Sequence, residues 1–214
     1  MLERFGLLGD VHAEDVALAT ALEHFARVGV DAVLCVGDVV DGRGDLERCR
    51  ELLEGHRVAC VAGNHERWLL GGTMRSLADA HRAERLTAAT RAFLASLPPT
   101  REFETPAGRL LLCHGVGDDD MAQLRPYDEG YALANNAALA RLRAAGRYRF
   151  AVGGHTHRRM ARRFGDLCFV NPGTLFREHE PGFATLDLGA GAVQFFEWRA
   201  PGGAPTPLEP LPLP

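Results

Sequence analysis

Side chains of the kind that bind metal ions follow five separate apolar, strand-like runs in this sequence. The run at 33–36 ends in Gly37-Asp38, and four other runs end in a comparable way. The polar residues at the five run ends are Asp10 and His12, Asp38, Asn64 and His65, His114, and His155 and His157. A single Gly-Asp after a strand is ordinary turn chemistry. Because open α/β sheets bind ligands beyond the carboxyl ends of their strands, five such ends predict one shared site.

The residue types at these ends suit divalent metal ions. Carboxylate and amide oxygens with imidazole nitrogens, and no thiolate, favour Mn²⁺, Fe, Zn²⁺ or related ions over a structural zinc site. Two ions ~3.5–4 Å apart would hold a phosphoryl group, lower the pKa of a bridging water and stabilise the attacking and leaving oxygens. Such a pair needs about seven or eight ligands, one of them a shared carboxylate, and the sequence contains that number.

Alternating strand and helix patterns in the first half of the chain would position these residues. Strand-like runs cover 4–8, 32–36 and 57–62. Between them, the spacing of apolar residues predicts helices at 15–28 and 46–53, each followed by a glycine. This β-α-β-α-β order predicts an α/β fold with parallel strands.

The second half of the chain has the pattern of short strands, typical in its last part of an antiparallel sheet. These strands are expected at 103–104, 110–113, 149–152, 167–170, 183–188 and 192–198. A helix is predicted at 131–145. The alanine-rich stretch from 66 to 98 has a helical pattern, and two interpretations of 66–100 stay open: a lid over the site, or a helical pair on the flank.

The composition is that of an ordinary globular protein. The chain has 214 residues and a mass of 23.3 kDa, with 46% hydrophobic and 24% charged residues, so a single domain at 1–200 suffices. The proline-rich stretch at 201–214 is expected to be a disordered or extended tail. The net charge of −4 and pI of about 6.1 argue against general nucleic-acid binding and leave a small charged substrate open.

The cysteines and the hydropathy pattern indicate a cytoplasmic protein. The five cysteines are an odd number, four of them lie in strand-like runs, and no CxxC pair is present. Buried reduced thiols therefore fit better than disulfides. No run reaches the ~20 apolar residues of a membrane helix, and no apolar signal region precedes the first strand. We expect no membrane contact, and a homo-oligomer stays open.

Five short motifs in the chain resemble those of the calcineurin-like metallophosphoesterases. They are GDVH at 9–12, GDVVDG at 37–42, GNHE at 63–66, HG at 114–115 and GHTH at 154–157. In addition, NPGT at 171–174 is similar to the NPGS-type element of the small bacterial and archaeal phosphodiesterases in this superfamily. The resemblance implies a four-layer α/β/β/α sandwich with mixed sheets and a dinuclear metal site at one edge.

The resemblance also implies roles for individual residues. One ion would be held by Asp10, His12, Asp38 and His157, and the other by Asp38, Asn64, His114 and His155, so that Asp38 is the bridge. Manganese is the first choice for both ions, with Fe, Zn²⁺, Ni²⁺ or Mg²⁺ as alternatives. While a metal-bridging hydroxide attacks, His65 would donate a proton to the leaving oxygen or stabilise its charge, and Asp41 would orient His65. Glu66 completes the third motif without an assigned role.

Two departures from the protein serine/threonine phosphatases of this superfamily concern the substrate. Those enzymes carry GDxVDRG and RGNHE, whose arginines bind the phosphate. Gly42 and Ala62 stand at the two arginine positions here. Because a phosphate monoester is a dianion that benefits from such arginines, their absence favours a phosphodiester or a dinucleoside polyphosphate as the small phosphate-ester substrate. A loop arginine could substitute, and Arg43 and Arg177 are the candidates.

Three alternatives to a phosphodiesterase stay open. They are a phosphomonoesterase or protein phosphatase, a dinucleoside polyphosphate hydrolase, and a catalytically silent binding scaffold of the same fold. A silent scaffold would have lost His65 or a metal ligand, whereas every position is filled here. The histidines outside the motifs are expected to be surface or packing residues, namely His24, His56, His81 and His179.

Overall fold

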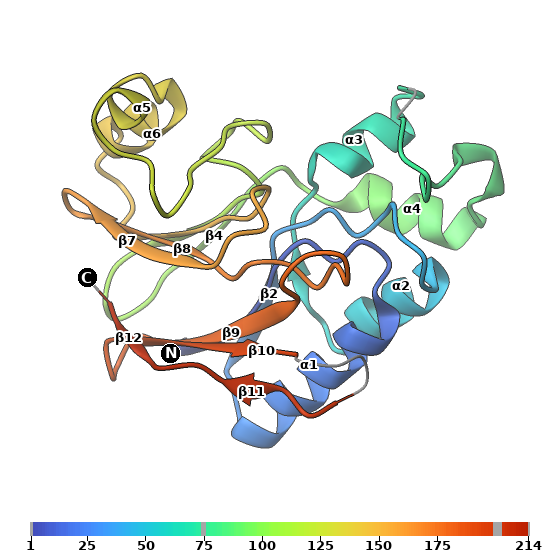
Figure 1. The fold of residues 1–214 in the computed structure, drawn as a ribbon, viewed down its shortest axis with the longest axis horizontal. Helices are drawn as coiled ribbons and strands as arrows, with labels where there is room; N and C mark the ends of the chain where they lie inside the picture. The colour runs from blue at the N-terminus through green and yellow to red at the C-terminus, as the bar shows by residue number, and fades with distance from the viewer. Residues whose placement is uncertain (1, 74–75, 199–202, 214) are drawn as a thin grey trace.

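Two mixed β-sheets form the centre of the computed structural model, which describes residues 2–73, 76–198 and 203–213 (Figure 1). The strands of the first sheet are, in spatial order, β11 (Thr206–Pro207), β10 (Ala192–Glu197), β9 (Gly182–Asp187), β1 (Arg4–Leu8), β2 (Ala32–Cys35) and β3 (Ala59–Cys60), with β12 (Leu211–Pro212) also pairing with β10. Those of the second sheet are β4 (Arg101–Phe103), β5 (Leu110–Leu112), β6 (Phe150–Val152), β8 (Leu167–Asn171) and β7 (Met160–Phe164).

The helices cover the outer faces of the two sheets. They are α1 (Asp15–Val28), α2 (Leu46–Gly55), α3 (Asn64–Leu70), α4 (Ala88–Ser96), α5 (Gly130–Ala134) and α6 (Ala137–Ala144), with a 3₁₀-helix at Ala83–Arg85. Figure 1 shows α1 and α2 on one side of the molecule and α5 and α6 on the opposite side, with the sheets between them. The order of layers is therefore helix, sheet, sheet, helix, which confirms the predicted four-layer fold.

Alternation of apolar side chains along the strands builds the three cores that join these layers. In β1, Phe5 and Leu7 face the core between the sheets, while Leu8 faces the core beneath α1 and α2. In β5, Leu110 and Leu112 face the core between the sheets. Successive side chains of a strand point to opposite faces, so a run that is apolar throughout is buried on both sides.

Parallel pairing brings the predicted run ends to one edge of the molecule. Leu8 of β1 pairs with Cys35 of β2, and Cys35 pairs with Cys60 of β3. In the second sheet Leu112 of β5 pairs with Val152 of β6 in the same parallel sense. Because these strands end in register, the polar residues that follow them emerge side by side.

The structure differs from the sequence prediction in two helical segments. The helical pattern at 66–98 is interrupted, because α3 ends at Leu70 and the next helical residues that the structure describes are 83–85 and 88–96. Gly72 has a left-handed φ of 72° and breaks the helix. The predicted helix at 131–145 divides into α5 and α6, since the Asn136 side chain accepts a hydrogen bond from the Leu139 N–H and begins a new helix there.

The proline-rich C-terminal stretch is extended where the structure describes it. Its short strands β11 and β12 both pair with β10, and Leu208 and Leu213 pack against the core between the sheets. Residues 201, 202 and 214 of the predicted tail lie outside the described residues. Within the described residues, the tail therefore adds two short strands to the edge of the first sheet.

The cysteines are as expected, since all five are buried and free. Within the described residues, no helix combines the length and apolar character needed to cross a membrane.

Candidate metal centre

The structure brings together all seven residues predicted as metal ligands. Ligand atoms lie within 4.8 Å of one another in three groups: Asp10, His12 and His157; His12, Asp38 and His65; and Asp38, His114 and His155. The Asn64 side chain joins the third group, because its Oδ1 lies 2.8 Å from His114 Nε2 and 2.9 Å from His155 Nδ1. Since Asp38 and His12 each belong to two groups, the side chains form one continuous cluster.

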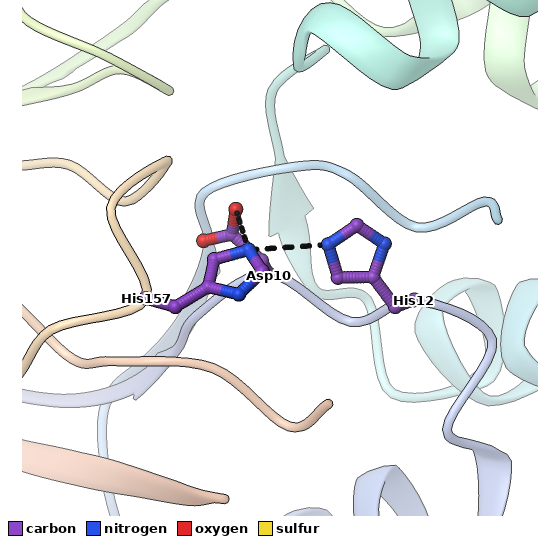
Figure 2. Close-up of side chains that lie close together, drawn as sticks. All are labelled: Asp10, His12 and His157. Atoms are coloured by element: carbon purple, nitrogen blue, oxygen red, sulfur yellow. Dashed lines mark hydrogen bonds and ion pairs between the residues drawn. The ribbon is translucent and has the colours of Figure 1, made fainter. Parts of the chain in front are cut away.

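The first group contains polar atoms that are poorly satisfied by one another. Figure 2 shows His157 beside Asp10 and His12, and its Nε2 lies 3.1 Å from Asp10 Oδ2 and 3.2 Å from His12 Nε2. Asp10 is fully buried, and its Oδ2 accepts no well-aligned hydrogen bond. In the third group, His155 Nε2 is likewise buried without a partner. Buried polar atoms without partners are costly, so these residues fit a bound cation.

Second hydrogen bonds hold two of the imidazoles in the orientation of a ligand. His12 Nδ1 donates to the carbonyls of Val40 and Asp41, each at 3.0 Å, and His114 Nδ1 donates to the carbonyl of Val36 at 2.8 Å. Nδ1 therefore carries a proton in both rings, and Nε2 is the nitrogen that faces the cluster. This is the usual arrangement of metal-binding histidines.

The charges in the cluster are mutually dependent. Burial favours the neutral ring of His114, but the carboxylate of Asp38 outweighs this effect and raises the pKa of His114 to about 10. Burial likewise opposes ionisation of Asp38, but His114 and His65 lower its pKa below the ordinary value. For His12, burial lowers the pKa and favours the neutral ring. Asp38 and His114 thus stabilise each other in their charged forms.

Left-handed backbone conformations are concentrated at this site. Five residues of the motifs have positive φ angles although they are not glycine: His12 (46°), Asp38 (46°), Asp41 (65°), His155 (65°) and His157 (56°). Among the described residues, the only other such positions are Ala13 and Arg57. Side chains with a Cβ rarely adopt this conformation, and it persists where surrounding contacts enforce it.

Glu66, which the sequence analysis left without a role, supplies such contacts. Its carboxylate is fully buried and accepts hydrogen bonds from four backbone N–H groups: Asp38 (2.9 Å), Val39 (2.7 Å), Val40 (3.2 Å) and Gly63 (2.8 Å). Burial and the charge of Asp38 raise the pKa of Glu66 to about 7, while the N–H donors act in the opposite direction. Glu66 therefore ties the loop after β2 to the loop after β3.

Close packing explains why no arginine stands at position 42. A Cβ atom on Gly42 would collide with the backbone carbonyl oxygen of His12, a metal-ligand candidate. Any side chain at this position would displace the loop that carries His12. The phosphate-binding arginine of the serine/threonine phosphatases thus has no room in this chain.

A pocket of ≈ 350 Å³ opens beside the cluster. It is lined by His12, Asp41, Arg43, His65, Leu77, Ala78, Asp79, His157, Phe176, Glu178 and His179. Arg43 lies in the pocket wall and forms ion pairs with Asp79 and Glu178. Arg177 does not line the pocket, because its guanidinium Nε and Nη2 donate to the two carboxylate oxygens of Glu14 elsewhere.

Two histidines expected to be surface or packing residues lie at the site. His179 Nδ1 is 2.6 Å from His157 Nδ1, and His81 exchanges two hydrogen bonds with Asp41. The other two fit the expectation, because His24 packs among phenylalanine rings and His56 is exposed. His81 and His179 stand outside every motif, so spacing could not have identified them.

Comparison with known proteins agrees with this geometry. Residues 4–191 match the family model described as the calcineurin-like phosphoesterase superfamily domain. A metallophosphoesterase from Sphaerobacter thermophilus has a similar fold, with a TM-score of 0.67, 21% identity, and coverage of 92% of this chain and 88% of that chain. The phosphoesterase Yfce from E. coli has a TM-score of 0.59 and 18% identity, with coverage of 99% of this chain and 100% of that chain. An archaeal phosphodiesterase has a TM-score of 0.57 and 15% identity, with coverage of 91% of this chain and 99% of that chain.

The Glu66→Gln variant tests the role of the buried carboxylate. Each Glu66 oxygen accepts from two N–H groups, so an amide nitrogen must face two donors and leave them unsatisfied. We expect the free energy of unfolding to fall by about 2 kcal/mol or more, measured by urea denaturation. The exposed Glu23→Gln is the matched control. Equal stability of both variants would contradict the assignment.

Metal binding should release protons. His114 must lose its proton to offer Nε2 as a ligand, and its raised pKa means that it carries that proton at pH 7. We expect release of about one proton per site at pH 7, and Mn²⁺ affinity that rises with pH below the pKa of His114. Isothermal titration calorimetry in two buffers of different ionisation enthalpy measures both. Buffer-independent heats would show that His114 is not a ligand.

Proposed function

The chain belongs to the calcineurin-like phosphoesterase superfamily, and from this premise we propose that it is a metal-dependent hydrolase of phosphate esters, with phosphodiesters as the preferred substrates. The observation that carries the proposal is the convergence of seven ligand candidates around Asp38, beside an open pocket that also contains His65. A catalytically silent scaffold would have no need for this complete set.

The ligand candidates divide around Asp38 into two sets. Asp10, His12, Asp38 and His157 would hold one divalent ion, and Asp38, Asn64, His114 and His155 would hold the other, with Mn²⁺ as the first choice. When bound, the ions supply Lewis-acid stabilisation of a phosphoryl group and lower the pKa of a water molecule. The role of Asp38 in this division rests on its place in two of the three side-chain groups.

His65 is held in the orientation of a general acid. Its Nδ1 lies 2.7 Å from Asp41 Oδ2 and donates to it, so Nε2 points away from Asp41. Burial lowers the pKa of His65, but the hydrogen bond to Asp41 and the charge of Asp38 outweigh burial and raise it. The ring is therefore protonated more readily than a free histidine, and Nε2–H can donate to the leaving oxygen of the ester.

The pocket wall favours a diester over a monoester. Its arginine, Arg43, is already neutralised by Asp79 and Glu178 among the described residues. A monoester dianion would thus lack the charge-assisted hydrogen bonds that it needs. Leu77, Ala78 and Phe176 add an apolar surface to the same pocket, which suits the second, uncharged ester group of a diester. The similarity to an archaeal phosphodiesterase supports this preference.

A pair of aryl substrates tests the preference. We expect bis(p-nitrophenyl) phosphate to be hydrolysed by the Mn²⁺-loaded protein with a kcat/KM about tenfold above that of p-nitrophenyl phosphate, the order of one charge-assisted hydrogen bond. A dinucleoside tetraphosphate and cyclic nucleotides complete the panel. A higher value for the monoester would contradict the diester assignment while leaving the hydrolase assignment intact.

Substitutions of Asp38 and His65 should fail in different ways. Asp38→Ala removes a candidate shared ligand, so metal content and activity should fall together. His65→Ala removes the general acid but no ligand, so metal content should stay and kcat should fall by roughly 10²–10⁴ for a nucleoside leaving group. Nitrophenolate leaves without a proton, so His65→Ala should reduce kcat only slightly on a nitrophenyl ester. Loss of metal in His65→Ala would overturn the assignment.

A further inference from the structure

Asp41 and His81 form a reciprocal pair of hydrogen bonds between two loops. The backbone N–H of Asp41 donates to the ring Nδ1 of His81 at 2.9 Å, and the backbone N–H of His81 donates to Asp41 Oδ1 at 2.7 Å. The Asp41 carboxylate is buried, with 1% exposure, whereas the His81 ring is 23% exposed at the surface. A residue 40 positions away in sequence thus holds both the main chain and the side chain of Asp41.

This pair fixes the carboxylate that orients His65. Asp41 adopts a left-handed φ of 65°, a conformation that is unfavourable for a residue other than glycine. The bond to His81 Nδ1 satisfies its N–H in this conformation. With Oδ1 bound to the His81 backbone, Oδ2 is left to accept from His65 Nδ1. His81 therefore contributes to both the position and the rotation of the Asp41 carboxylate.

The residues just before His81, at 77–79, form one wall of the pocket. Leu77, Ala78 and Asp79 line it, and Asp79 forms the ion pair with Arg43. The segment is attached to the loop after β2 at two places, through Asp79 and through His81. These contacts therefore fix the position of the pocket wall relative to the Asp41 carboxylate.

We propose that His81 is a positioning residue for the general acid, and that its ring Nδ1 holds Asp41 so that His65 Nε2 faces the leaving group. The inference rests on the proposed hydrolysis. His81 touches neither substrate nor metal ligand in this role and acts only through Asp41. Because Nδ1 accepts a hydrogen bond, the ring carries its proton on Nε2.

The role of the ring can be separated from that of the backbone. His81→Ala keeps the N–H that binds Asp41 Oδ1 but removes the acceptor of the Asp41 N–H. His81→Asn places a side-chain oxygen near the position of Nδ1 and can accept the same bond. The exposed His56→Ala is the matched control for loss of a histidine.

The experiment compares kcat on two diesters, bis(p-nitrophenyl) phosphate and thymidylyl-thymidine, whose sugar leaving group needs a proton. We expect His81→Ala to lose about tenfold in kcat on thymidylyl-thymidine, with little loss on the nitrophenyl ester and with KM and metal content unchanged. His81→Asn should restore the wild-type value. The double variant His65→Ala/His81→Ala should be no worse than His65→Ala, because residues that act as a unit are not additive.

Three results would overturn the proposal: equal losses on both substrates, no restoration by asparagine, or a double variant in which the two losses multiply. A second readout does not depend on activity. In the Zn²⁺-loaded protein, the NMR signal of the His65 Nδ1 proton, identified by its absence in His65→Ala, should broaden by faster exchange in His81→Ala and persist in His81→Asn. An unchanged signal in His81→Ala contradicts positioning. If the wild type hydrolyses no ester, the proposed function fails while this signal still decides the contact.

Discussion

The structure of the site depends on one buried carboxylate. Glu66 accepts four backbone N–H bonds, three from the loop after β2 and one from the loop after β3. Those loops carry Asp38 and Asn64. A buried N–H group without an acceptor costs about 1–3 kcal/mol, so these bonds fix the backbone from which the metal-ligand candidates extend. The neighbouring Gly63 has no room for a Cβ, which would meet the Asp38 carboxylate.

Strain and unsatisfied polar atoms then have a common explanation. Left-handed residues, orphaned buried atoms such as Asp10 Oδ2 and His155 Nε2, and close imidazole nitrogens all occur in the same cluster. Each of these features lowers the stability of the folded protein when no cation is bound. The rigid frame of parallel strand ends and the Glu66 hydrogen bonds maintain them, which leaves a preformed set of donors for cations. The locally unfavourable conformations thus occur where the proposed chemistry needs a fixed geometry.

The sequence predicted the fold, and it also predicted that the ligand candidates lie together, because both follow from local patterns. Apolar runs ending in polar residues located the strand ends, and the motifs identified the order of the layers. Contacts between distant segments could not be predicted in this way. His81 and His179 reach the site through loops without a motif, and Asp120 binds Arg67 of α3. Glu66 was visible in its motif, but its four backbone partners appear only in the fold.

The pocket shows how packing narrows the chemistry. The His12 carbonyl leaves no room for a side chain at Gly42. The guanidinium of Arg43 forms ion pairs with Asp79 and Glu178. In the proposed function the site relies on two divalent cations, and the central requirement of that proposal is a carboxylate common to both. Anomalous diffraction from crystals grown with Mn²⁺ tests this most directly. We expect two manganese peaks that both contact Asp38; a single peak, or two peaks that do not share Asp38, would contradict the shared ligand.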